Sequence, residues 1–338
     1  MKKEVRGKSS AKPKNLAIFF KNNLDNLASA ILLQHRLKNI MTFDEKKTIL
    51  IPINYDSYTE YRDFEKFPFI KNDDYRIIFL GLSLDKYFEI TNDFKKKIFF
   101  NCSYHSDNPH GLINLTFPSN STIEIIDKTF PLKFKEENDE NIKNLIKNIK
   151  TLNTCRTGSN FDEYKNSIVS FPGCLEYYAY HNRITVPKAS NLLQKYMTGK
   201  FDKGDRSVVN DLISFNTKII NSFSLNNQVV QTKIKNKTVE IYHYSETQID
   251  YLLAVYLHKA YALMDPNAPD ITVLLYYNPK TPDKMIYSLK TKIQDFPFEK
   301  ISSNSLHYNS RESTCLIPRA SNNGKLYKQI LDQIKSLI

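Results

Sequence analysis

Residues 16–38 read LAIFFKNNLDNLASAILLQHRLK and carry the clearest structural signal in the chain. The five residues LAIFF form an apolar run long enough for a buried strand. After a short polar turn, apolar side chains recur near helical spacing from residue 25 to residue 38. Asp25 or Asn26 suits the N-cap, because its side chain accepts a hydrogen bond from an unpaired amide at the start of a helix. The segment therefore predicts a strand, a turn and a helix.

Further apolar runs on the C-terminal side of this segment predict strands at residues 48–53, 76–81, 97–101 and 121–126. Helical segments separate several of these runs. Strands that alternate with helices pair in parallel within a layered α/β domain. The sequence therefore predicts an α/β N-terminal domain built on a parallel sheet.

The last third of the chain has a different order of elements. Its patterns predict strands at residues 239–243, 271–277, 285–290 and 314–317, and helices at 245–264 and 325–338. This order is typical of a smaller, mixed α/β domain.

An amphipathic helix is predicted at residues 136–153. We expect domains at residues 15–196 and 223–338, joined by a polar linker and a helix at residues 197–222.

The composition is that of a basic globular protein. The chain has 338 residues, with 48 Lys plus Arg, 36 Asp plus Glu and a formal net charge of +12. No apolar run approaches the roughly 20 residues that a membrane span needs, so no membrane role is expected. The cysteines stand alone, without a C-x-x-C pair, at Cys102, Cys155, Cys174 and Cys315. This spacing argues against a zinc knuckle or a disulfide scaffold, and we expect a reducing, cytoplasmic location.

The N-terminal residues 1–14, MKKEVRGKSSAKPK, contain six basic residues and one acid. They predict a flexible cationic tail that suits nucleic acid or the acidic face of a protein partner. The alternative is that abundant Lys and Asn reflect an AT-rich genome, in which case the charge is not specific to a partner.

The carboxyl ends of the predicted strands are the positions to inspect for chemistry, because ligands of open α/β sheets bind there. These ends lie at residues 21–26, 81–83 and 101–105. Cys102, His105 and His110 are close in sequence, but their spacing matches no common zinc site. A nucleophilic Cys102–His105 pair has no identifiable Asp or Asn to orient the histidine.

The first of these positions resembles a known family. Residues 20–30, FKNNLDNLASA, are similar to the first motif of the DHH phosphoesterase superfamily. In that motif a strand runs into His-x-Asp-x-Asp-Gly and then into a helix that begins with small residues. Residues 52–55 and 79–83 resemble the next two segments of the family. Residues 101–103 fall at its name-giving Asp-His-His.

The resemblance extends into the last third of the chain. Residues 271–277, followed by YSLKT at 287–291, resemble the DHH-associated C-terminal domain, in which a strand precedes a Ser-Leu-Arg-Ser segment. The family's later glycine-rich loop falls near residues 305–312. By resemblance, Lys21, Lys290, His307 and Arg311 are candidates for binding anions or nucleic acid.

The departures from the family concern its metal ligands. The family uses Asp and His side chains to hold two manganese or magnesium ions, and only one Asp of its first motif remains here. Mapped residue by residue, the family's site falls on Lys21, Asn23, Asp25, Gly81, Asn101, Cys102, Ser103 and His181. Hard divalent cations need several anionic oxygen ligands, which this set does not supply. The resemblance therefore implies a DHH-like fold without metal cofactors and without phosphodiesterase activity by that mechanism.

Three interpretations follow from the sequence. The leading one is a catalytically inactive DHH-like protein that binds nucleic acid or acts as a scaffold subunit of a larger assembly. The second is a manganese- or magnesium-dependent phosphoesterase or nuclease with displaced ligands. The third is a structural protein that binds protein partners alone.

Overall fold

The computed structural model describes residues 14–38, 43–53, 75–82, 97–101, 113–116, 121–131, 139–153, 161–176, 184–222, 228–244, 251–277, 283–301, 305–308 and 312–338. Contacts group the chain into two compact units. The first comprises residues 1–150 and 175–206, and the second comprises residues 151–174 and 207–338. The segment 151–174 thus packs with the C-terminal part of the chain.

The first unit contains a parallel sheet in the strand order β2-β1-β3-β4-β5. The strands are β1 (Lys14–Lys21), β2 (Phe43–Ile53), β3 (Tyr75–Leu80), β4 (Lys97–Asn101) and β5 (Ile113–Thr116). The order reverses after β1, because β2 pairs on one side of it and β3 on the other. The predicted parallel α/β architecture is confirmed.

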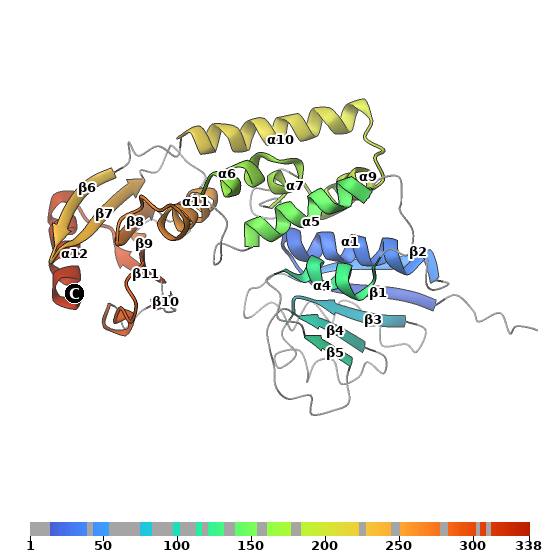
Figure 1. The fold of residues 1–338 in the computed structure, drawn as a ribbon, viewed down its shortest axis with the longest axis horizontal. Helices are drawn as coiled ribbons and strands as arrows, with labels where there is room; N and C mark the ends of the chain where they lie inside the picture. The colour runs from blue at the N-terminus through green and yellow to red at the C-terminus, as the bar shows by residue number, and fades with distance from the viewer. Residues whose placement is uncertain are drawn as a thin grey trace, which may run out of the picture. The chain divides into compact units, whose positions relative to one another are not determined.

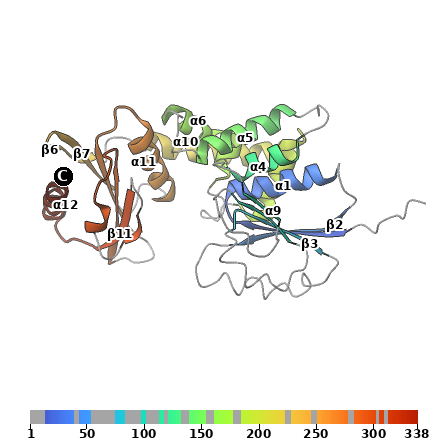
Figure 2. The same cartoon turned by 60° about the horizontal axis from the view of Figure 1, so that its bottom comes forward.

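The helix α1 (Leu24–Lys38) follows β1 and lies on one face of this sheet, beside α4 (Thr122–Thr129), as Figures 1 and 2 show. Residues 16–20 of β1 and 24–33 of α1 are buried almost throughout. Small side chains at Ala28, Ser29 and Ala30 let α1 approach its neighbours closely. The sequence signal at residues 16–38 therefore builds the centre of the first unit.

The predicted strand at residues 121–126 is wrong, because residues 122–129 form α4. The fifth strand is instead β5. Ile123 and Ile126 are three positions apart and both buried, as expected for one face of a helix. The helix is tied to its neighbours by Arg36 of α1, which bonds Asp127 at 2.9 Å, and by Lys150, which bonds Glu124 at 3.1 Å.

Two further helices of the first unit are α5 (Asp139–Asn153) and α9 (Val186–Met197). The predicted helix at 136–153 corresponds to α5, and its apolar residues Ile142, Leu145 and Ile149 are buried. The side chain of Asn141 donates to the carbonyl of Tyr196 at 3.0 Å and so fixes α5 against the end of α9.

The second unit contains a mixed sheet in the strand order β10-β11-β9-β8-β7-β6. Its strands are β6 (Gln228–Ile234), β7 (Lys237–Tyr244), β8 (Ile271–Tyr277), β9 (Lys284–Thr291), β10 (Ser305–Tyr308) and β11 (Glu312–Pro318). β7 and β8 are parallel, and the other neighbours are antiparallel. The predicted mixed α/β character is confirmed, although the sequence patterns missed β6 and β10.

Helices cover both faces of the mixed sheet (Figures 1 and 2). On one face, α12 (Asn323–Leu337) packs Leu326, Ile330 and Ile334 against the strands. On the other, α11 (Tyr251–Met264) contributes Tyr261 to a cluster rich in tyrosine. The remaining elements of the unit are α6 (Phe161–Val169), α7 (Phe171–Cys174), most of α10 (Lys203–Ser222) and the 3-10 turn η3 (Phe298–Lys300).

Within the part of the chain that the structure describes, no helix combines the length and the apolar character needed to cross a membrane. The predicted start of a helix at Ser245 lies outside the described residues, as do residues 1–13 of the predicted tail.

Candidate functional site

The candidate site lies where β1 and β3 end, at the carboxyl edge of the parallel sheet. The strand order reverses between these two strands, and such a reversal is the usual place for a ligand in an open α/β sheet. Lys21 is the last residue of β1, and Gly81 follows the last residue of β3. The amide of Asn22 donates to the carbonyl of Ile53 at 3.0 Å, so the loop after β1 is held to the end of β2.

Asn23 caps the N-terminus of α1. Its Oδ1 accepts hydrogen bonds from the backbone amide of Asn26 at 2.9 Å and from the Asn26 side chain at 2.8 Å. The predicted cap at Asp25 or Asn26 is therefore wrong by two or three residues. Asn23 uses its side-chain oxygen to satisfy an amide that the helix itself leaves unpaired.

Asp25 caps a different helix, α4. Its Oδ2 accepts from the amide of Thr122 at 2.8 Å, and its Oδ1 accepts from the amide of Ile123 at 2.9 Å. The hydroxyl of Ser121 also donates to Oδ1, at 3.2 Å. The carboxylate is 6% exposed and so stabilises the start of α4 from within the core.

Gly81 permits the close approach of Asn26 to the end of β3. Its φ is +65°, and a Cβ built there would lie 2.3 Å from Oδ1 of Asn26. Any larger residue would therefore clash with the Asn26 side chain and strain the backbone. This close packing accounts for glycine at the position where the resembled family carries an acid.

Glu176 is a site residue that the sequence did not reveal. Burial raises the pKa of its carboxyl to about 8, the charge of Asp25 raises it further in the same direction, and Lys21 opposes both. Glu176 thus lies close enough to Asp25 and Lys21 for their charges to act on it, and at pH 7 it is mostly protonated. The one available signal was a lone acid in the apolar and aromatic segment FPGCLEYYAY at residues 171–180.

Of the positions that the resemblance assigns to the metal site, the described ones do not supply the ligands that two metal ions need. Among the described residues at this edge, Asp25 and Glu176 are the acids close to one another, two carboxyl groups are few for a pair of hard cations, and the ammonium of Lys21 would repel a cation. Among the described residues, no group of three or more His, Cys, Asp or Glu side chains is arranged to hold a metal ion.

The other predicted site residues are placed only in part. The backbone of Asn101 ends β4 at the same edge of the sheet as Lys21, while Cys102, Ser103 and His181 lie outside the described residues. The backbone of His307 pairs with Thr314 between β10 and β11, and Arg311 lies outside the described residues.

Lys290 belongs to β9 in the second unit, and its side chain is 2% exposed. Its Nζ donates to the hydroxyl of Ser288 at 2.9 Å. Burial and the nearby charge of Lys290 hold the pKa of His258, on α11, well below its usual value. Lys290 is thus part of a buried polar group between β9 and α11, and its role in binding anions stays a prediction.

Comparison with known proteins gives the fold. No protein-family model and no curated protein matches the sequence. Among solved structures, a DHH domain protein described as a member of a family of ribosomal proteins matches with a TM-score of 0.60 and 9% identity. The match covers 96% of this chain and 87% of that one.

Two other solved structures match less closely. CDC45 from Entamoeba histolytica has a TM-score of 0.44 at 10% identity, over 96% of this chain and 94% of that one. An exopolyphosphatase-related protein from Bacteroides fragilis has a TM-score of 0.45 at 14% identity, over the same shares of the two chains. The first match, together with the strand order of the parallel sheet, shows the fold. The chain has a DHH-like fold.

Proposed function

We propose that this chain is a DHH-like protein that has lost metal-dependent phosphoesterase activity and binds nucleic acid, as a subunit of a larger assembly. The main support for this proposal is that Asp25 caps helix α4. Its carboxylate is bound by Ser121, Thr122 and Ile123 at the start of α4. Asp25 is thus used at the start of α4, and a single carboxylate does not supply the several anionic oxygen ligands that hard divalent cations need.

The neighbours of Asp25 favour an anion over a cation. Lys21 brings a positive charge to the switch point of the sheet, and the N-terminus of α1 begins three residues later. Helix N-termini and lysines both favour phosphate groups. A protonated Glu176 does not repel phosphate, and its hydroxyl can donate a hydrogen bond.

The charge of the whole chain supports a polyanionic partner. A net charge of +12, part of which comes from the basic segment 1–14, attracts nucleic acid at long range. The competing proposal, a scaffold that binds protein partners alone, assigns no role to Lys21 and predicts no salt-dependent binding of oligonucleotides.

A gel-shift assay with single- and double-stranded oligonucleotides, at about 50 and about 200 mM salt, tests the proposal. We expect a shift at the lower salt concentration that weakens steeply at the higher one, because Lys and Arg displace counterions from phosphates. The absence of a shift at both concentrations would overturn nucleic-acid binding and leave the protein-only scaffold.

The variant Lys21→Glu locates the interaction. We expect it to weaken oligonucleotide binding by about tenfold or more, because it places a second anionic group near Asp25. Lys188→Glu is the matched control, since Lys188 is an exposed residue of α9 in the same unit and undergoes the same charge change. Equal losses in the two variants would show that only the overall charge matters.

A further inference from the structure

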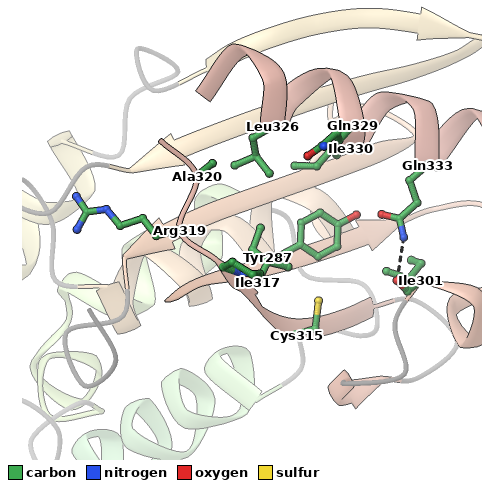
Figure 3. A pocket seen from close by; sticks show the side chains of 11 residues that line it. Tyr287, Ile301, Cys315, Ile317, Arg319, Ala320, Leu326, Gln329, Ile330 and Gln333 are labelled. Carbon is green, nitrogen blue, oxygen red and sulfur yellow. Dashed lines mark hydrogen bonds between the residues drawn. The ribbon is translucent and has the colours of Figure 1, made fainter. Parts of the chain in front are cut away.

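A cavity of about 590 Å³ lies in the second unit, between the mixed sheet and α12 (Figure 3). Pockets for small molecules commonly span about 300–1,000 Å³. Its lining includes the largely apolar side chains of Tyr287, Ile301, Cys315, Leu326 and Ile330. They come from β9, β11, α12 and the residue after η3, so the cavity lies within a single compact unit.

Tyr287 brings an unpaired polar atom to this cavity. The residue is 2% exposed, and its hydroxyl is buried without a hydrogen-bond partner. Figure 3 shows the hydroxyl directed toward the part of the pocket formed by Gln333 and Ile301. Buried hydroxyl groups are nearly always paired, so this one indicates a missing acceptor.

Gln333 helps to form the polar end of the cavity. Its Nε2 donates to the carbonyl of Ile301 at 2.8 Å, which fixes the orientation of the carboxamide. The end of α12 is thereby tied to the segment after η3, and the wall near the Tyr287 hydroxyl is held in place. A fixed wall favours a pocket that exists before a ligand arrives.

The charge around the cavity favours a neutral ligand. Among the described residues that line it, Arg319 is the only one with a charged side chain, and it is exposed. Figure 3 shows its guanidinium directed away from the other lining side chains. A charged group inside the cavity would therefore lose its hydration without gaining a partner of opposite charge.

We propose that this cavity binds a neutral, largely apolar small molecule, whose carbonyl, ether or ring-nitrogen acceptor receives the hydrogen bond of the Tyr287 hydroxyl. The binding is independent of the proposed nucleic-acid site, because the cavity is formed by residues of the second unit alone.

Three probes of similar shape test the chemistry on the full chain by ligand-observed NMR titration. Benzophenone is neutral and has a carbonyl acceptor, diphenylmethane lacks the acceptor, and 4-benzoylbenzoate carries a negative charge. We expect benzophenone to bind about fivefold more tightly than diphenylmethane, the ratio that one hydrogen bond typically gives. We expect the anion to bind most weakly.

Two variants locate the site. In Tyr287→Phe, the preference for benzophenone over diphenylmethane should disappear while both still bind. In Ala320→Trp, all binding should be lost, because Ala320 lines the cavity and is only partly buried, so the larger ring can occupy it. Val229→Thr is the control, since Val229 is an exposed apolar residue on β6, and it should bind as the parent chain does.

Photolysis of bound benzophenone, followed by peptide mapping, gives a second readout. Crosslinks should fall in the peptides that contain Tyr287, Ile301 or residues 315–333. Equal affinity of benzophenone and diphenylmethane for the parent chain, an unchanged preference in Tyr287→Phe, or crosslinks elsewhere would overturn the proposal. No measurable binding of any probe would also overturn it and leave water as the occupant.

Discussion

Asp25 stands at a position where the resembled family has a metal-binding Asp, but here its carboxylate caps a helix. It is the acid that survives from the motif of the resembled family, yet in this structure it receives hydrogen bonds from Thr122 and Ile123 at the start of α4. A carboxylate there stabilises the helix through its unpaired amides and its dipole. Asp25 therefore joins α1 to α4 in the core of the first unit.

Replacing Asp25 tests whether its carboxylate stabilises the start of α4. We expect Asp25→Ala to lower the free energy of unfolding by about 2–4 kcal/mol, because two buried amides lose their acceptor and the helix loses its cap. Urea unfolding of the full chain measures the effect. Glu140→Gln, at an exposed position of α5, should stay within about 0.5 kcal/mol of the parent chain.

An increase in the free energy of unfolding for Asp25→Ala would point to a different role for this residue. Crowded acids that await a metal ion repel one another, so removing one of them stabilises the metal-free protein. A gain in stability for Asp25→Ala would therefore indicate a ligand site and contradict the capping role.

Glu176 makes the stability of the first unit depend on pH. Its pKa is raised from 4.5 to about 8, chiefly by burial, so the folded chain keeps a proton that the unfolded chain loses between these values. The stability contributed by this group is fully present below pH 4.5 and is lost as the pH rises through 8.

Glu176→Gln should remove this dependence. The parent chain should lose stability from about pH 5 to about pH 9 with a contribution of up to about 1.4 kcal/mol per pH unit from Glu176, and the variant should lose less. Urea unfolding at several pH values provides the comparison. Glu299→Gln, at an exposed position, should keep the parent profile, and identical profiles for Glu176→Gln and the parent would show that Glu176 is not the group responsible.

Among the elements, α4 shows where sequence reasoning failed. Its sequence TIEIIDKT is rich in β-branched residues and favours a strand by local propensity. The helix forms because Asp25, distant in the sequence, caps its first turn, while Arg36 bonds Asp127. Local pattern cannot reveal a cap supplied by another helix.

The hairpin of β6 and β7 was missed for a different reason. Its two-residue turn consists of Lys235, with φ of 46°, and Asn236, with φ of 67°. Two-residue hairpin turns usually have the sequence Asn-Gly or Asp-Gly, so a Lys-Asn pair predicts such a turn only weakly. The strand before the turn, QVVQTKI, was therefore not recognised.

A better turn sequence should stabilise this hairpin. We expect the double change Lys235→Asn and Asn236→Gly to raise the free energy of unfolding by about 0.5–1 kcal/mol, because both residues then tolerate positive φ. Lys235→Val should instead lower it by about 1–2 kcal/mol, since a β-branched residue is strained there. Thermal unfolding would contradict the turn geometry if the two variants changed stability in the same direction.

At the scale of the whole molecule, the sequence predicted the parallel sheet, the mixed second sheet and the DHH-like fold. Those predictions depended on apolar runs such as residues 16–20 and 271–277, whose local hydrophobicity alone predicts a buried strand. Of the residues named from the sequence, Lys21 and Gly81 lie at the ends of β1 and β3, and Asn23 and Asp25 lie in the turn and helix after β1, while their role as a site stays a prediction. Glu176 could not be predicted from the sequence, because its nearness to Asp25 depends on the packing of segments about 150 residues apart.

Under the proposed function, the chain binds nucleic acid without a metal ion. Fluorescence anisotropy of a labelled oligonucleotide tests it, measured in EDTA and again with Mn²⁺ at matched ionic strength, over a series of salt concentrations. We expect no gain in affinity from Mn²⁺, a steep loss with rising salt, and a signal that stays constant over time. Binding that requires Mn²⁺, or a signal that decays in its presence as the oligonucleotide is cut, would contradict metal-free binding.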